Sequence, residues 1–298
     1  MTIYNLGSIN LDHVYRVRHF VRPGETLSSS GYRALLGGKG ANQSIALARA
    51  GAEVRHIGAI GEADAWILQT LIEAGVETSA IARRQEASGH AIIQVTREAE
   101  NAILLYPGAN HSLTRSQIEQ ALVRGGSGDW LLLQNETNGL SDAMDLATER
   151  GVRVAFNPAP MVSRDIAPLL DRVDLLIVNE GEAMDLTGAS TVAAAEARLH
   201  NDYPRLRILL TLGRDGVVYV TPEGRYRAPA FSVDAVDTTA AGDTFIGFCL
   251  ADLAAGQAPE MALRRASAAA ALCVTRAGAA SAIPTLAEVE TFLASNVP

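Results

Sequence analysis

The chain has 298 residues, of which 48% are hydrophobic, and a formal net charge of −8. This length suits one large α/β domain or two smaller ones, and the acidic balance argues against a broad nucleic-acid surface. The two cysteines, Cys249 and Cys273, lie in apolar helical stretches without a C-x-x-C pair, which indicates buried thiols rather than zinc ligands or disulfides. The N-terminal residues do not resemble a signal peptide, and no apolar run reaches about 18 residues. We therefore expect a cytoplasmic protein that contacts neither membrane nor nucleic acid.

Strand-like and helix-like segments alternate along the chain. This alternation predicts an α/β fold with a central, mostly parallel sheet flanked by helices. The predicted strands are Ile3–Ser8, Val54–Ala59, Trp130–Leu133, Val152–Phe156, Leu175–Val178 and Ile208–Leu212. The predicted helices are Ala41–Ala50, Ala65–Ala74, Leu140–Arg150, Thr191–His200 and Ala262–Thr275.

Two regions do not follow this alternation of strands and helices. Val14–Leu35 alternates polar and apolar residues, and Ser88–Tyr106 contains two extended runs, His90–Val95 and Ala102–Tyr106. Neither region has the pattern of a crossover helix, so we expect both to form one small second sheet. These segments, near residues 13–36 and 88–106, would belong to a single domain that spans residues 1–298.

A glycine-rich segment, Gly37-Gly38-Lys39-Gly40-Ala41-Asn42, opens the first predicted helix. Its glycines would let a small polyhydroxy ligand approach the backbone, and Lys39 and Asn42 can donate hydrogen bonds. The spacing fits neither a P-loop nor a dinucleotide-binding fingerprint. The simpler alternative is a glycine-rich turn into a buried helix, with Lys39 in solvent.

The segment Asp237-Thr238-Thr239-Ala240-Ala241-Gly242-Asp243-Thr244 leads into an apolar helical run, Thr244–Ala255. A helix N-terminus offers unpaired N–H groups and a positive dipole end, and small residues let an anion come close to them. Asp243 would then stand beside a phosphate, kept ionised by the helix terminus, as a base for phosphoryl transfer to a hydroxyl. The alternative is that Asp243 is only the N-cap of the helix.

These two segments resemble the two signature motifs of the ribokinase family of carbohydrate kinases, the PfkB superfamily, and they occur in the same order. The similarity extends along nearly the whole chain through Gly7–Asp12, Asn157–Pro160, Asn179–Glu182 and Thr211–Gly216. The resemblance implies a ribokinase-like α/β fold with a small β lid and an ATP-dependent kinase that phosphorylates a sugar's primary hydroxyl, D-ribose to D-ribose 5-phosphate. The alternatives are another sugar or nucleoside kinase of this family, acting on deoxyribose, fructose, 2-keto-3-deoxygluconate or a nucleoside, and a non-catalytic sugar-binding protein. Retention of Asp243 argues against the last, because binding alone needs no base.

The resemblance also implies roles for individual residues. Asp243 would be the base, beside an anion hole of Ala240, Ala241 and Gly242. Sugar contacts are expected from Asn10, Asp12, Gly38, Lys39, Gly40, Asn42, Glu136 and Asp243, with lid residues such as His13, Ile92 and Ile103 selecting the sugar. Nucleotide contacts are expected from Asn179, Thr211, Leu212, Gly213, Arg214, Asp215, Gly216, Gly242 and Ser267. The simpler alternatives are a solvated loop carboxylate for Glu136 and a plain β-turn for Thr211–Gly216.

Two metal ions and a dimer follow from the same resemblance. Glu182 would hold Mg²⁺ through water, while the N-x-x-E pattern also fits a capping box, and the two roles are compatible. K⁺ would activate the enzyme from a site built mostly of backbone carbonyls, at Asp237, Thr239, Cys273, Arg276, Gly278 and Ala282. The chain departs from the family at Ala282, where a serine is common, and at Ser267, where a larger side chain often lies near the adenine. The lid implies a homodimer.

Overall fold

The computed structural model describes residues 1–98 and 100–296. Ala99, inside the predicted lid region 88–106, and Val297 and Pro298, at the end of the predicted domain 1–298, lie outside these described residues. Within the described residues, the larger sheet has nine strands, which all run in the same direction except β12, because β12 pairs antiparallel with both β11 and β13. Their spatial order is β13 (Gly224–Ala228), β12 (Val217–Thr221), β11 (Arg207–Thr211), β10 (Leu175–Asn179), β9 (Arg153–Asn157), β8 (Trp130–Gln134), β1 (Thr2–Leu6), β4 (Glu53–Gly61) and β5 (Ile81–Arg84).

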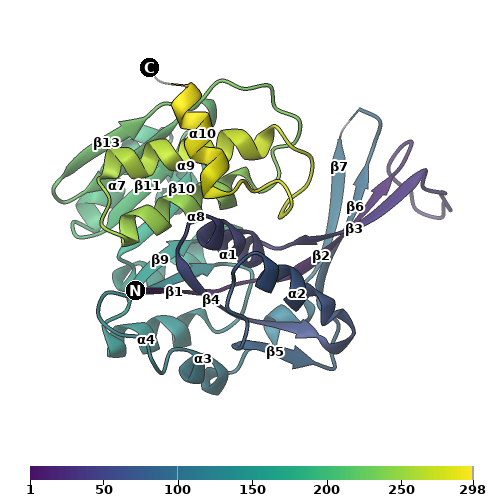
Figure 1. The fold of residues 1–298 in the computed structure, drawn as a ribbon, viewed down its shortest axis with the longest axis horizontal. Helices are drawn as coiled ribbons and strands as arrows, with labels where there is room; N and C mark the ends of the chain where they lie inside the picture. The colour runs from purple at the N-terminus through teal and green to yellow at the C-terminus, as the bar shows by residue number, and fades with distance from the viewer. Residues whose placement is uncertain (99, 297–298) are drawn as a thin grey trace.

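Helices cover both faces of this sheet (Figure 1). They are α1 (Lys39–Arg49), α2 (Trp66–Glu73), α3 (Arg115–Ala121), α4 (Leu140–Arg150), α5 (Ser163–Ile166), α6 (Glu180–Thr187), α7 (Val192–Asp202), α8 (Ala241–Ala254), α9 (Pro259–Val274) and α10 (Leu286–Ser295). Residues of α1, α8 and α9 share one apolar core cluster, and residues of α3, α4 and α7 share another. Adjacent residues of β1, Ile3 and Tyr4, belong to different clusters because side chains alternate across a strand. The α/β fold expected from the alternating segments is therefore confirmed.

The predicted strands and helices are present, with their ends shifted by a few residues. The shift at α8 matters most, because the helix begins at Ala241 rather than at the predicted Thr244. The apolar residues that predict this helix begin only at Thr244, where the helix becomes buried. The small residues before it continue the same helix at the protein surface. None of the helices in the described ranges is long and apolar enough to span a membrane.

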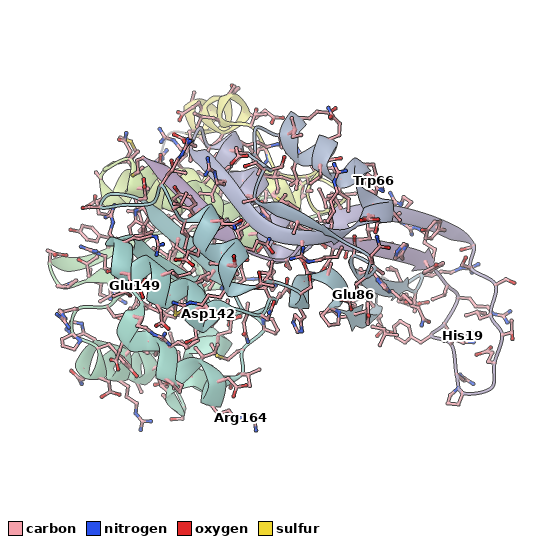
Figure 2. All side chains as sticks on the ribbon, turned by 90° about the horizontal axis from the view of Figure 1, so that it is seen from below. His19, Trp66, Glu86, Asp142, Glu149 and Arg164 are labelled. Atoms are coloured by element: carbon pink, nitrogen blue, oxygen red, sulfur yellow. The ribbon has the colours of Figure 1, made fainter. Side chains whose placement is uncertain are left out.

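A second sheet projects from the body and is built from the two regions that break the α/β rhythm (Figure 1). Its strand order is β3 (Gly31–Gly37), β2 (Asn10–Arg16), β6 (Gly89–Val95) and β7 (Asn101–Tyr106). Figure 2 shows His19 at its outer end, where the imidazole lies 2.9 Å from the carboxylate of Glu25. The alternating pattern thus predicted this sheet correctly.

The faces of the second sheet separate the expected lid residues. His13 pairs with Ile92 in the register of β2 and β6, so these two side chains share a face. Asp12 lies on the opposite face, since neighbours in a strand point in opposite directions. Asp12 pairs with Ala91 on β6, and Ile103 pairs with Ile93, which lies two residues after Ala91. Ile103 therefore shares the face of Asp12. Of these three lid residues, only Ile103 is on the side that carries the candidate sugar ligand.

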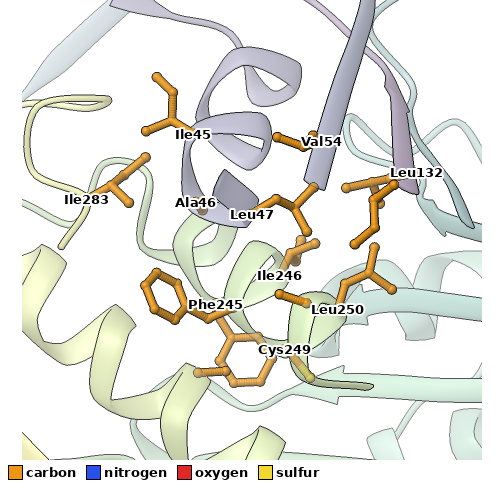
Figure 3. Close-up of a cluster of buried hydrophobic side chains, with 14 of the residues drawn as sticks. Ile45, Ala46, Leu47, Val54, Leu132, Phe245, Ile246, Cys249, Leu250 and Ile283 are labelled. Carbon is orange, nitrogen blue, oxygen red and sulfur yellow. The ribbon is translucent and has the colours of Figure 1, made fainter. Parts of the chain in front are cut away.

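Helices α1 and α8 pack against each other in the centre of the core cluster drawn in Figure 3. The contact is close at Gly247, where an added Cβ would overlap the methyl group of Ala46. One helical turn earlier along each helix lie Asn42 and Gln43 on α1 and Asp243 on α8. The tight packing therefore brings two motifs, some 200 residues apart in sequence, into direct contact.

Candidate active site

The site residues gather at the carboxyl ends of the parallel strands. Ser8 follows β1, Glu136 follows β8, and Asn179 and Thr211 are the last residues of β10 and β11. Open α/β sheets bind ligands at this edge, because the loops that leave the strands there can all reach one crevice.

Asp243 lies in the first turn of α8, and its side chain points toward α1. The Asn42 amide donates to Oδ2 of Asp243 at 3.0 Å, and the Gln43 amide donates to Oδ1 at 2.9 Å. The N-cap position belongs to Ala240, which makes no side-chain capping bond. The alternative that Asp243 is only a helix cap is therefore wrong.

The backbone around Ala240 opens the start of α8 toward an anion. Ala240 has a φ of 60°, and it is the one non-glycine residue with a positive φ in the described part of the chain. Backbone of this kind is strained and is often found at functional sites. The N–H of Ala241 donates to Thr238, whereas those of Gly242 and Asp243 have no acceptor among the described residues. Two backbone donors are therefore free beside the Asp243 carboxylate.

Burial raises the pKa of Asp243 above its ordinary value, and this effect outweighs the opposing charge of Lys39 and the hydrogen bonds from Gln43 and Asn42. Burial thus opposes the effect expected from the helix terminus, which favours the ionised carboxylate. A raised pKa makes a carboxylate a better proton acceptor.

A cavity of about 870 Å³ adjoins the start of α8. Seven residues of the predicted nucleotide set line it: Asn179, Thr211, Gly213, Arg214, Gly216, Gly242 and Ser267. Leu212 and Asp215 do not line it. An apolar part of the wall comes from Phe231, Val233, Phe245, Ala270, Ala271 and Val274. Sequence analysis did not identify the segment after β13, although its short apolar run is a recognisable signal.

The turn at Thr211–Gly216 combines both interpretations that its sequence allows. It connects β11 to the antiparallel β12 through a short 3₁₀ turn, η4 (Gly213–Asp215), as a plain turn would, and it also lines the cavity. Gly216 has a φ of 95°, and an added Cβ would overlap the carbonyl oxygen of Ala228. Only glycine fits there.

Asp12 projects from β2 into a half-buried position. Burial, and then the nearby charge of Glu136, raise the pKa of Asp12 to about 6. No described residue donates a hydrogen bond to its carboxylate. A partly buried carboxylate in this state is able to accept hydrogen bonds from hydroxyl groups of a ligand.

Glu136 and Asn42 complete this side of the site. Glu136 accepts hydrogen bonds from the Lys39 backbone N–H at 3.2 Å and from the Ser8 hydroxyl, so it is not a solvated loop carboxylate. Asn42 is 5% exposed, and its Oδ1 is buried without a hydrogen-bond partner among the described residues. This acceptor is available to a ligand hydroxyl.

The remaining members of the predicted sugar set lie around these groups. The Asn10 side-chain oxygen accepts a hydrogen bond from Asn110 at 2.7 Å, a partner that sequence analysis missed. Gly38 has a φ of 90° and is the N-cap of α1. Gly40 lets the first turn of α1 touch the end of β1, because an added Cβ would overlap the backbone at Gly7 and Ser8. Lys39 is half-buried beside Asp243.

Glu182 forms the capping box that its sequence pattern allows. Asn179 N donates to the Glu182 carboxylate at 2.9 Å, and Glu182 N donates to Asn179 Oδ1 at 2.9 Å. Glu182 does not line the cavity, whereas the exposed Glu180 does. Sequence analysis missed Glu180, which offers a second carboxylate on this side.

The two loops expected to hold K⁺ lie together. Asp237 accepts hydrogen bonds from the N–H groups of Thr239 at 2.9 Å and Gly278 at 3.0 Å. Burial raises the pKa of Asp237, but these bonds outweigh burial, so the pKa lies below its ordinary value. Cys273 donates to Thr239 O at 3.7 Å. Arg276 pairs with Glu288 at 2.7 Å, and Ala282 is buried. The Ser281 hydroxyl lies near Gly278, within 2.6 Å of where a Cβ would be.

The similarity to known proteins extends over almost the whole chain. The model of the pfkB family carbohydrate kinases matches residues 2–286. The ribokinase of Haemophilus influenzae is 40% identical, with 98% of each chain covered. The structure of Arabidopsis thaliana ribokinase complexed with ribose and ATP superposes with a TM-score of 0.86 at 28% identity, covering 98% of both chains. Ribokinase from Cryptococcus neoformans var. grubii serotype A in complex with ADP gives 0.87 at 34% identity, covering 97% of this chain and 99% of that one. The chain described here therefore belongs to the pfkB family of carbohydrate kinases.

Proposed function

We propose that this protein transfers the γ-phosphoryl group of ATP to the primary hydroxyl of D-ribose, giving D-ribose 5-phosphate and ADP. One observation carries the proposal. The Asp243 carboxylate is held by two amides of α1 on the sugar side, and the residues directly before it, Ala241 and Gly242, line the 870 Å³ cavity. The likeness to ribokinases that bind ribose, ATP and ADP supports both substrates.

The sugar is proposed to lie between the second sheet and α1. Asp12 has a raised pKa and accepts no hydrogen bond from the part of the chain that the structure describes, where the Asn42 side-chain oxygen also has no partner. These two groups are the acceptors for the sugar's hydroxyls. Glu136, Asn10 and Lys39, together with the backbone at Gly38 and Gly40, complete the contacts. A sugar that satisfies these groups replaces hydrogen bonds that would otherwise go to water.

In the proposed reaction, Asp243 accepts the proton of the primary hydroxyl. The hydroxyl oxygen forms a bond to the γ-phosphorus as the bond from that phosphorus to the β–γ bridging oxygen breaks, and ADP leaves. The free N–H groups of Gly242 and Asp243, with Ala240 and Ala241 in the same turn, stabilise the negative charge of the transferring group. Such stabilisation is strong because the donors are fixed in place before the reaction.

Two ions are part of the proposal. Glu182, through water, and Glu180 would hold Mg²⁺, which neutralises charge on the phosphates of bound ATP. K⁺ is proposed to bind between residues 237–239 and 273–282 and to order the loop before α8. The proximity of the Ser281 hydroxyl to Gly278 supports this site despite the methyl group of Ala282.

We also propose that the whole chain acts as one cytoplasmic kinase domain that forms a homodimer through the second sheet. The face of this sheet that carries His13 also carries exposed large apolar side chains, among them Tyr32 at 53%, Ile92 at 38% and Leu104 at 68%. Contiguous exposed apolar residues favour a protein interface.

A coupled ADP-release assay across several acceptors tests the proposal. The panel contains ribose, deoxyribose, fructose, 2-keto-3-deoxygluconate and several nucleosides, each with Mg²⁺ and ATP. We expect the highest kcat/KM with ribose. A higher value with another acceptor would reassign the substrate, and acceptor-dependent ADP release from none of them would favour a sugar-binding protein without catalytic activity.

A further inference from the structure

A row of polar side chains runs from Asp243 into the interior below the sugar side of the site. All of its members are 0% exposed: Gln43, Gln134, Asn5, Ser44 and His56. Burying a polar group is unfavourable unless it is hydrogen-bonded, and these residues bond to one another in sequence. The arrangement joins α1 to strands β1, β4 and β8.

The donor and acceptor directions in this row follow from its two ends. Beside the active site, the Asn157 amide lies 3.0 Å from the Ile177 carbonyl, which can only accept, so that end of Asn157 is the NH₂ group. The Asn157 oxygen therefore accepts the Gln43 amide at 3.2 Å. Gln43 consequently presents its NH₂ group to both Asn157 and Asp243, and its oxygen accepts from Gln134 at 2.7 Å.

The end of the row at His56 requires the same donor and acceptor directions. The Asn5 amide lies 2.8 Å from the Gly40 carbonyl, so the Asn5 oxygen accepts from Gln134 at 2.9 Å. The second hydrogen of the Asn5 amide goes to the Ser44 hydroxyl at 2.8 Å. Ser44 then donates to His56 Nδ1 at 2.8 Å, and His56 Nε2–H donates to the Gly7 carbonyl at 3.1 Å. Burial lowers the pKa of His56 to about 4, which keeps its imidazole neutral at physiological pH.

We propose that Gln43 is a positioning residue for the base Asp243 and that the buried row ending at His56 holds the Gln43 amide in its donating orientation. The inference rests on the proposed function, in which Asp243 accepts the proton. Both hydrogens and the oxygen of the Gln43 amide are engaged, so the amide cannot rotate without breaking three hydrogen bonds. Gln43 thereby selects the ionised carboxylate, since a protonated Oδ1 would place its proton against the NH₂ group.

The charged and titratable groups near Asp243 are few. Lys39 on α1 favours the ionised form of Asp243. Burial first, and also the charge of Asp243, raise the pKa of the Cys273 thiol on α9. Asn42 donates to the other oxygen. Loss of the Gln43 donor should therefore raise the pKa of Asp243 further and turn its carboxylate away from the fixed geometry.

Two variants test the role of Gln43. Gln43→Met keeps the side-chain length and removes both polar groups, and Gln43→Glu replaces the donor with a second carboxylate. A hydrogen bond to a charged group corresponds to about a 10- to 100-fold effect on the ionisation equilibrium. We expect kcat of Gln43→Met to fall by about that factor on the acid limb of the kcat–pH profile, where Asp243 is mostly protonated, so that the limb is displaced to higher pH while the KM for ATP stays within about threefold. Gln43→Glu should displace the limb further, because two carboxylates then share one site.

Gln117→Met is the matched control. The Gln117 amide also makes three hydrogen bonds, to Gly58, Ala80 and Arg84, but it lies on α3, away from the site. This variant should keep the wild-type kcat and pH profile. Folding of every variant is checked by far-UV circular dichroism and by calorimetric ATP binding.

An unchanged kcat and acid limb in folded Gln43→Met would overturn the inference, as would the same loss in Gln117→Met. If Gln43→Met does not fold, Gln134→Met is measured instead, because it frees the Gln43 amide to rotate and should still displace the limb. An unchanged limb there would overturn the role of the row. An inactive Asp243→Asn together with a normal Gln43→Met would refute this inference alone, whereas an active Asp243→Asn would refute the proposed function.

Discussion

Replacing Asp243 by asparagine removes the proton acceptor while leaving the shape of the site almost unchanged. The Gln43 amide is held as a donor by Asn157 and Gln134, so the oxygen of the new side chain must face Gln43. Its NH₂ group then faces Asn42, whose Oδ1 has no partner among the described residues and can turn to accept it, which moves this oxygen away from the proposed sugar site. The variant can therefore keep both hydrogen bonds to α1 and should fold.

The expected magnitudes follow from this geometry. General-base assistance contributes about 10²–10⁴-fold, so kcat should fall by that factor, which is about 3–5 kcal/mol in activation free energy. Stability should change in the opposite direction. The pKa of Asp243 is raised in the folded state, so its ionised form destabilises the fold above that pKa, and the effect disappears as the pH falls below the ordinary carboxyl pKa. Asparagine removes this destabilisation at neutral pH, so the free energy of unfolding should equal or exceed that of the wild type.

The assay combines ADP release at saturating ATP and ribose with calorimetric binding of both ligands and with thermal unfolding at about pH 7 and pH 5. Binding of ATP should stay within several-fold. A kcat within about tenfold of the wild type would show that Asp243 is not the base. If Asp243→Asn were much less stable than the wild type at neutral pH, the argument from the raised pKa of Asp243 would be refuted.

Further predictions concern the sugar side, the ions and the assembly. In Gly37→Ala the added methyl would overlap the Asp12 carboxylate, so the KM for the sugar should rise by about tenfold or more while the KM for ATP is unchanged; equal sugar KM values would contradict this. Ionised Asp12 should be lost as the pH falls through about 6, so kcat/KM for the sugar should fall along an acid limb at that pH. Glu136→Gln removes a neighbouring negative charge, so it should move this acid limb to lower pH. Exchange of Na⁺ for K⁺ at constant ionic strength should increase kcat, and equal rates in the two salts would remove the proposed K⁺ site. Leu104→Lys should shift the protein from dimer to monomer in sedimentation equilibrium, and an unchanged mass would rule out an interface at this residue.

The fold was predictable because its periodic elements each bury a continuous face. Helix α4 is found at the predicted bounds, Leu140–Arg150, and the strands that line the carboxyl edge differ only at their ends. The helix α8 was located too late in the sequence, since apolar periodicity reports only the buried part and Ala241 and Gly242 are small surface residues. Resemblance to the family placed Asp243 at the site, and periodicity alone would have left it as a cap.

Contacts between distant segments were beyond sequence reasoning. The pairing of Gln43 with Asp243 depends on the close approach of α1 and α8 at Gly247, which no local pattern reports. Gln43 directly follows Asn42 in the glycine-rich motif, and it shares a helix face with Lys39, four residues earlier. This spacing is a signal that could have identified Gln43 as a site residue. The faces of the second sheet depend on strand register, so Ile92 and Ile103 could not be told apart before the pairing was known.

The position of the transferred phosphoryl group is the most direct test of the proposed activity. The protein is incubated with ATP, Mg²⁺ and D-ribose, and the product is analysed by phosphorus NMR and mass spectrometry. We expect a sugar monophosphate whose phosphorus is coupled to the two protons on C5, formed together with one equivalent of ADP. Free inorganic phosphate, or an ester at another carbon of ribose, would contradict it.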